Sequence, residues 1–153
     1  MIFYHYTTRD ALEKIFAEGL TLGEAPISAT RVARAVNLTT DPDPSGHGLD
    51  GAGDVVTEEW SAKLAAHGIR VPPGTVLANK REARIKIKLP SSDPKLRQWR
   101  TWSRKHCEPG FADVLEQTGG ATKRKARTWW LYFGIIPSSK FDGVEIFVPE
   151  ASD

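Results

Sequence analysis

The sequence predicts an α+β domain, and three stretches of the chain carry that prediction. Residues 2–6, IFYHY, are rich in aromatic and β-branched side chains, which is typical of a strand, and a helical pattern follows at once. Residues 82–89, EARIKIKL, alternate apolar and polar side chains and indicate a strand with one buried face and one wet, basic face. Residues 128–136, TWWLYFGII, are apolar on both faces and predict a buried strand. Because the elements follow no regular βαβ order, α+β is favoured over a parallel α/β fold.

Length and composition narrow the class of protein. The 153 residues predict a single domain over residues 1–153, and 40% apolar residues are sufficient for one core. Cys107 is the only cysteine, which excludes an intrachain disulfide framework and a cysteine-rich zinc site. The chain shows no signal-peptide pattern and no apolar run of about 18 residues. We therefore expect a cytoplasmic protein without a membrane partner.

The first half of the chain alternates helical and extended patterns. Thr7, with Asp10 three residues later, is expected to cap a helix that continues to about residue 18 and ends at Gly19. The pattern then predicts a short helix, a strand and a Gly/Pro-rich loop over residues 27–35, 36–40 and 41–54.

The second half begins with a helix that Thr57 is expected to cap and that continues to about His67. After the alternating strand, Asp93 and Pro94 predict the start of another helix, which carries Trp99, Trp102 and several cations. The remaining elements are a short helix, a basic loop and a last strand over residues 111–117, 119–127 and 143–148.

Charge is distributed unevenly along the chain. Residues 80–127 contain fourteen Lys and Arg against five Asp and Glu, which is a net charge of +9. The rest of the chain contains seven Lys and Arg against fourteen Asp and Glu, which is a net charge of −7. A basic segment of this kind fits a polyanionic partner, and it equally fits an ordinary solvated face.

No metal or phosphate-loop motif is complete. Residues 41–52 resemble a calcium loop in their first positions, but Ala52 occupies the place of the bidentate Glu. The four histidines lack the i, i+4 spacing of a helical metal site, so we expect no metal. The glycines of the same loop do not match a phosphate-binding pattern. His47 in this loop therefore belongs either to a segment that closes over a ligand or to an ordinary surface loop.

The aromatic residues near His5 and in residues 128–136 leave two readings open. His5 lies between two tyrosines of the first strand, and the residues alone fit either a buried structural histidine or a ligand-binding one. Trp129 and Trp130 must face opposite sides of their strand. Tryptophan beside basic residues is typical of single-stranded nucleic-acid binding, whereas the i, i+3 pair Trp99 and Trp102 is typical of a core-facing helix stripe.

Three segments together resemble the ADP-ribosyltransferase superfamily. The stretch Tyr4-His5-Tyr6-Thr7 is similar to the family's first motif, and Val36-Asn37-Leu38-Thr39-Thr40-Asp41 looks like its middle motif. Residues 129–137, WWLYFGIIP, are similar to the third motif and precede a last strand. The resemblance implies a split antiparallel or mixed β-sheet with flanking helices, and an origin in a bacterium or a phage.

The resemblance also implies a site for NAD. His5 would hydrogen-bond a ribose hydroxyl, the backbone of Tyr6 would hold the nicotinamide carboxamide, and Thr7 would support the turn. Thr39 and Thr40 would line the nicotinamide pocket. The remaining contacts with NAD would come from His47 and Trp130.

The sequence departs from the family at two positions. Tyr6 occupies the place of the usual Gly, and Trp130 occupies the place of the catalytic Glu. Trp130 can stack on a base or sugar, but it cannot polarise a ribose hydroxyl. The reaction passes through an oxocarbenium-like transition state, which needs charge stabilisation. That role would fall to His5 together with His47, Glu145 or Asp41.

The expected function is ADP-ribosyl transfer from NAD to a macromolecule. The basic segment, residues 80–127, would then face a protein or nucleic-acid target. The alternative is a catalytically inactive member of the same fold that serves as a binding module for nucleotide, nucleic acid or protein. A third reading is a phosphotransferase acting on RNA ends, a class that the superfamily also contains.

Overall fold

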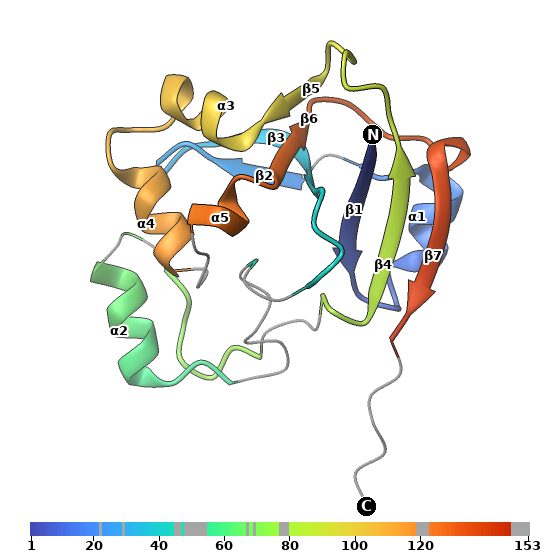
Figure 1. The fold of residues 1–153 in the computed structure, drawn as a ribbon. Helices are drawn as coiled ribbons and strands as arrows, with labels where there is room; N and C mark the ends of the chain where they lie inside the picture. Colours follow the sequence, from blue (N-terminus) through green and yellow to red (C-terminus); the bar gives the residue numbers. More distant parts are fainter. Residues whose placement is uncertain are drawn as a thin grey trace, which may run out of the picture.

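An antiparallel sheet forms the centre of the computed structural model (Figure 1). The structure describes residues 1–21, 23–28, 30–44, 47, 55–66, 68, 70–76, 80–118 and 123–147. Within these residues it contains seven strands, five α-helices and one 3-10 helix, so the predicted α+β class is confirmed. In chain order the elements are β1 (Ile2–Thr7), α1 (Leu12–Glu18), β2 (Gly23–Pro26), β3 (Val32–Thr39), α2 (Glu58–Ala66), β4 (Ala83–Lys88), β5 (Leu96–Gln98), α3 (Trp99–His106), α4 (Phe111–Thr118), α5 (Lys123–Ala126), β6 (Trp129–Tyr132), η1 (Ser138–Lys140) and β7 (Phe141–Ile146).

The strands follow the order β5-β6-β3-β1-β4-β7, and β2 pairs with the first part of β3, residues 32–35. Every pairing between these strands is antiparallel. β1 pairs with β4 along its whole length, from Ile2 opposite Lys88 to Thr7 opposite Ala83. With β3, in contrast, β1 shares a single pair, Tyr4 opposite Thr39. The sheet therefore separates into two halves at the junction between β1 and β3.

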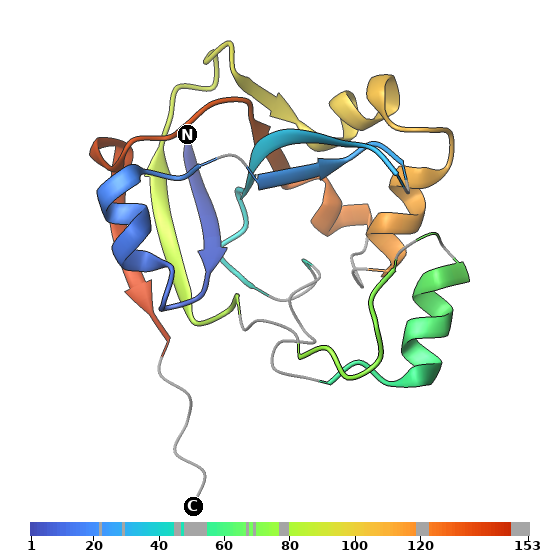
Figure 2. The same cartoon turned by 180° about the vertical axis from the view of Figure 1, so that it is seen from behind.

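Two hydrophobic clusters lie on opposite faces of the sheet, and the first spans both halves, because it contains Phe3 of β1 as well as Val36 of β3 and Tyr132 of β6. One cluster contains Phe3, Ile85 and Ile87, all fully buried, and α1 adds Leu12 to it. The second cluster lies at the other half, where Trp99 and Trp102 of α3 pack with Leu131 of β6. Figure 2 shows α1 against the β1-β4-β7 half, with α3 and α4 beside the β2-β3-β6 half. α1 thus packs in the first cluster, whereas α3 packs in the second.

Several predicted elements are confirmed by the structure. β4 shows the expected alternation, because Ala83, Ile85 and Ile87 are fully buried whereas Lys88 is exposed. Thr57 caps α2, and its hydroxyl oxygen accepts a hydrogen bond from the Trp60 N–H at 3.1 Å. The predicted helix over 111–117, the strand over 36–40 and the last strand are present as α4, β3 and β7.

The predicted helix over residues 27–35 is wrong. β2 and β3 occupy this region, and Pro26 pairs with Val32 directly beside their connection. β3 extends to Val32 because β2, the strand just before it in the chain, supplies partners for residues 32–35. Pairing between these two neighbouring strands here overrides the helical pattern.

Two predicted helix starts are also wrong. Thr7 does not cap α1, since it still belongs to β1, and the N-cap Ala11 has no side-chain cap. Asp93 does not start α3; its carboxylate accepts from the Lys95 N–H at 2.9 Å in a turn. β5 follows, and α3 begins at Trp99, where the Gln98 side chain accepts from the Thr101 N–H at 2.9 Å.

Other predicted boundaries change or lie outside the described residues. The predicted basic loop over 119–127 contains α5, and β6 ends at Tyr132, well before residue 136. Residues 45–46, 48–54, 67, 119–122 and 148, to which the predicted loops, helix end and strand end extended, lie outside the described residues. No helix of the described part of the chain has the length and apolar character needed to cross a membrane.

Candidate functional site

A cavity of about 400 Å³ lies where β1, β3 and β6 come together. One part of its wall is polar and comes from β1, β3 and the turn before β4, with His5, Tyr6, Thr7, Asn37 and Lys80. The other part is largely apolar and comes from β2, β6, α3 and α4, with Pro26, Trp99, Leu115, Trp129 and Leu131. The cavity therefore offers both hydrogen-bonding groups and aromatic surface.

His5 bridges the split between the two halves of the sheet. Beyond the Tyr4–Thr39 pair, β1 and β3 form no further ladder pair. Here the His5 Nδ1 atom lies 2.7 Å from the Asn37 carbonyl oxygen. A carbonyl oxygen only accepts hydrogen bonds, so Nδ1 carries the proton and donates it. The imidazole thus replaces a backbone contact between the two strands.

The protonation state of His5 follows from this contact and from its surroundings. The surrounding protein removes water from the ring, and this desolvation lowers the pKa of His5 below 6.5. The bond to Asn37 works against that shift, and the positive charge of Lys80 adds to it. His5 is therefore neutral at pH 7, and its Nε2 atom is left as a hydrogen-bond acceptor.

The residues that follow His5 also face the cavity. Tyr6 is 8% exposed, and its hydroxyl donates to the Asp41 carbonyl oxygen at 3.2 Å. Burial raises the pKa of Tyr6 to about 12, although Arg84 opposes the shift. Thr7 is also buried and lines the cavity. Tyr6 thus donates at every physiological pH and ties β1 to the segment after β3.

The two threonines at the end of β3 have different positions. Thr39 is buried and lines the cavity, but its hydroxyl is already engaged. It accepts from the Asp41 N–H at 3.1 Å and lies 2.8 Å from the Thr128 hydroxyl, which itself donates to the Lys125 carbonyl oxygen at 2.7 Å. Thr40 is absent from the cavity lining. Thr39 therefore contributes shape to the wall, while its hydroxyl links β3 to the start of β6.

Both tryptophans of β6 reach the cavity from opposite sides of the strand. Trp130 packs edge-to-face on Phe3, with ring centroids 5.6 Å apart, in the cluster that contains α1. Trp129 packs in the other cluster, and its ring centroid lies 6.3 Å from that of Trp99. Both line the cavity. The expected opposite orientation holds, and each indole contributes to the wall.

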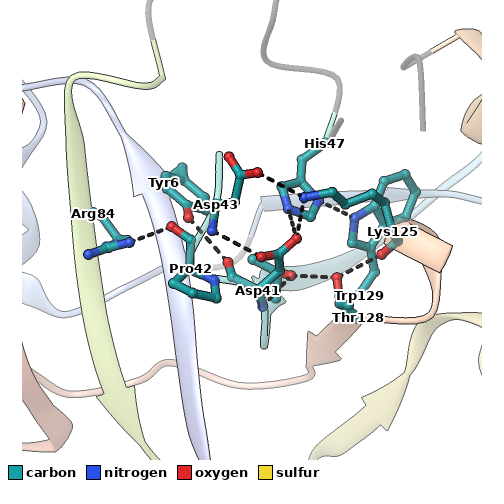
Figure 3. A network of polar contacts seen from close by, with 10 residues as sticks. Tyr6, Asp41, Pro42, Asp43, His47, Arg84, Lys125, Thr128 and Trp129 are labelled. Atoms are coloured by element: carbon teal, nitrogen blue, oxygen red, sulfur yellow. Dashed lines mark hydrogen bonds and ion pairs between the residues drawn. The ribbon is translucent and has the colours of Figure 1, made fainter. Parts of the chain in front are cut away.

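His47 is held by a network of polar contacts at the cavity (Figure 3). The Trp129 indole N–H donates to His47 Nδ1 at 2.7 Å, and His47 Nε2 lies 3.4 Å from the Asp41 carboxylate. The imidazole also stacks on Tyr6, with ring centroids 6.2 Å apart. Because Nδ1 accepts a hydrogen bond from the indole, the neutral His47 ring carries its proton on Nε2, whereas the His5 ring carries its proton on Nδ1. Desolvation lowers the pKa of His47, although Asp41 opposes the shift.

Asp41 joins this network to α5 and β4. Burial alone would raise the pKa of Asp41, but a hydrogen bond from the Lys125 ammonium and one from the Asp43 N–H bring it below its ordinary value. Lys125 Nζ lies 2.5 Å from the Asp41 carboxylate, and this contact raises the pKa of Lys125. Arg84 donates to the Pro42 carbonyl oxygen. The described part of the predicted loop is therefore fixed from three sides.

Glu145 lies outside this arrangement. It is on β7, its side chain is 60% exposed, and its carboxylate pairs with Arg84 at 2.5 Å. It is not part of the cavity lining, which contains no Asp or Glu among the described residues. Within the same residues, no group of three or more His, Cys, Asp and Glu could hold a metal ion. The site as described offers neutral hydrogen-bonding groups and one cation, Lys80.

The cavity thus gathers most of the residues expected to bind a cofactor: His5, Tyr6, Thr7, Thr39, His47 and Trp130. Sequence reasoning missed three other contributors, namely Asn37, Lys80 and Trp129 as the partner of His47. Asn37 and Lys80 carry no motif of their own and enter the site only through strand pairing. Trp129 could have been found, because an indole N–H that is partly buried generally has a hydrogen-bond partner.

Comparison of this chain with models of protein families, with curated proteins and with solved structures finds no match.

Proposed function

We propose that the cavity binds NAD and that the protein transfers the ADP-ribose of NAD to a macromolecular target. In this reaction the bond between nicotinamide and ribose breaks, and a nucleophilic group of the target forms a new bond to the same ribose carbon. Nicotinamide leaves with the bonding electron pair, and the nucleophile releases its proton.

The observation that carries the proposal is the state of His5. Its ring is fixed by Asn37 so that Nε2 is an acceptor, and it lies at the split of the sheet beside the cavity. A sugar hydroxyl is a hydrogen-bond donor that fits such an acceptor. Trp129 and Trp130 supply aromatic surface for a base or a sugar within the same cavity.

The arrangement of the chain supports the proposal further. A split antiparallel sheet, in the element order that the resemblance implies, agrees with an ADP-ribosyltransferase-like fold. The basic segment supplies exposed cations for a macromolecular target. Among them, Lys88, Lys95, Arg97, Arg104, Lys105, Arg124 and Arg127 form no ion pair with the residues that the structure describes.

A second candidate is a binding module that holds NAD or another nucleotide without transfer. The observation that favours it is the absence of a carboxylate among the described lining residues. An oxocarbenium-like transition state is usually stabilised by a negative charge, and neither Trp130 nor neutral His5 carries one. His47 could act as a base only after Trp129 releases its Nδ1 atom.

One experiment separates these candidates. We expect NAD to raise the melting temperature of the wild type and to leave His5→Ala unchanged, because a ligand stabilises only the state that binds it. His106→Ala is the matched control, since His106 is exposed on α3 and outside the cavity lining. Failure of NAD to stabilise the wild type at millimolar concentration would overturn the proposal.

Labelled NAD then decides between transfer and binding. Incubation with protein and RNA targets, followed by gel separation, should give label on one target with the wild type and none with His5→Ala. Stabilisation by NAD without any label transfer would support the binding module.

A further inference from the structure

The polar part of the cavity wall carries a positive charge. Its described lining contains no carboxylate, and Lys80 is its only permanently charged side chain. Both lining histidines, His5 and His47, have pKa values lowered by desolvation, so they add no charge at pH 7. The described lining therefore carries one positive charge and no negative one, which favours an anionic ligand.

Lys80 and Thr7 lie at the same corner of the sheet. β1 ends at Thr7, which pairs with Ala83, the first residue of β4, and Lys80 precedes Ala83 by three residues. Both Lys80 and Thr7 line the cavity. The charge of Lys80 is also close enough to His5 to lower its pKa.

Both side chains retain unused hydrogen-bonding capacity. Thr7 is only 8% exposed, yet its hydroxyl has no hydrogen-bond partner among the residues that the structure describes. The Thr7 hydroxyl oxygen is not itself fully buried, so it is open to a ligand in the cavity. Lys80 is exposed and forms no ion pair within the same residues.

We propose that Lys80 and Thr7 form an anion subsite that takes a phosphate or diphosphate group of the cavity's ligand. An ammonium group and a hydroxyl are both donors, and phosphate oxygens are acceptors. His5 Nε2 is an acceptor and suits a sugar hydroxyl. The ribose of the ligand would therefore lie beside His5, next to the anion subsite. The subsite thus orients a nucleotide with its phosphate toward the corner of β1 and β4.

This inference deepens the proposed function, because NAD carries a diphosphate, but its test is independent of NAD. The variants are Lys80→Ala and Thr7→Val, and the control is Lys88→Ala, an exposed lysine on β4 outside the cavity lining. The probes are ADP-ribose, adenosine and inorganic pyrophosphate, each titrated calorimetrically. Lys80 is exposed, so its truncation leaves the core intact.

We expect ADP-ribose to bind the wild type at least about tenfold more tightly than adenosine. Lys80→Ala should remove most of that difference without weakening adenosine binding, and Thr7→Val should remove part of it. Lys88→Ala should bind every probe as the wild type does. Added salt should weaken pyrophosphate binding to the wild type more than to Lys80→Ala.

The outcomes separate the subsite from the proposed function. If ADP-ribose binds Lys80→Ala as tightly as the wild type, the subsite is wrong while nucleotide binding stands. If pyrophosphate binds through Lys80 but neither ADP-ribose nor NAD binds, the subsite stands and the proposed function is wrong. If the wild type binds none of the three probes, both are overturned.

Discussion

Two histidines of the site use opposite ring nitrogens, and their neighbours decide which. His5 donates from Nδ1 to the Asn37 carbonyl, whereas His47 accepts at Nδ1 from the Trp129 indole. His5 therefore presents an acceptor, Nε2, that is free of that contact. The Nε2 atom of His47 lies 3.4 Å from the Asp41 carboxylate but forms no hydrogen bond with the described residues. His5 thus leaves an acceptor open beside the cavity, whereas His47 links the segment after β3 to β6.

The lowered pKa values of His5 and His47 predict a loss of stability in mild acid. Both groups have an ordinary pKa of 6.5, which applies to the unfolded chain, and a lower one when folded. Below pH 6.5 the unfolded chain binds more protons than the folded one, so the free energy of unfolding falls as pH falls toward the folded pKa values. The contribution of Asp41 is lost only below its ordinary value of 3.8 and leaves this window unaffected.

Urea unfolding at about pH 7.5 and about pH 5 measures this effect. The wild type should be less stable at the lower pH, and His47→Gln should show a smaller difference because one titrating group is gone. His106→Gln, which alters an exposed histidine, should retain the wild-type difference. Equal stability of the wild type at the two pH values would contradict the prediction.

At the scale of elements, the helix α1 is joined to the sheet through a glycine that no other residue can replace without strain. Gly19 ends α1 with φ 82° and ψ −178°, a region open essentially to glycine alone. A Cβ atom added there would lie 2.5 Å from the Ile136 carbonyl oxygen. Leu20 and Ile136 form an isolated bridge directly beside this contact. The close approach of two backbones therefore requires the absence of a side chain.

Gly19→Ala should destabilise the protein by about 3 kcal/mol or more, because backbone strain and a clash with Ile136 act together. Gly74→Ala is a matched control, since Gly74 has φ 85° but an added Cβ would meet nothing within 4 Å. Its cost should be about 1 kcal/mol, from backbone conformation alone. Chemical denaturation compares the two variants, and equal costs would show that the contact with Ile136 does not matter.

The elements also show which parts of this fold a sequence can predict. β4 and α2 were predictable because alternation and a capping threonine are local signals. β2 and β5 were missed, since both are short, and the partner of β5 lies far along the chain in β6. The residues of the candidate site divide in the same way. Those at the ends of β1 and β3 could be predicted from the resemblance that the sequence shows. Lys80 enters only through the pairing of β4 with β1.

At the scale of the whole molecule, charge is separated between parts of one chain. The basic segment, residues 80–127, carries a net charge of +9, while the rest of the chain carries −7. Most of its exposed cations lie on β4, β5, α3 and α5 or directly beside them, and thus on both halves of the sheet. Four half-buried cations of this segment, Arg84, Lys86, Arg100 and Lys125, are paired with carboxylates. Such a surface favours a polyanion as the target.

We therefore expect single-stranded RNA to bind at low salt and to be released as salt rises, because cations that neutralise phosphates release counterions. Replacement of Arg104 and Arg127 by Gln should weaken binding and make the plot of log affinity against log salt shallower by up to about one unit per lost contact. Replacement of Arg31 and Arg34 by Gln changes the net charge equally, and both residues are exposed outside the basic segment. Fluorescence anisotropy with labelled RNA makes the comparison. If both double variants lose the same affinity, net charge and not the basic segment determines binding, and a protein target becomes the better expectation.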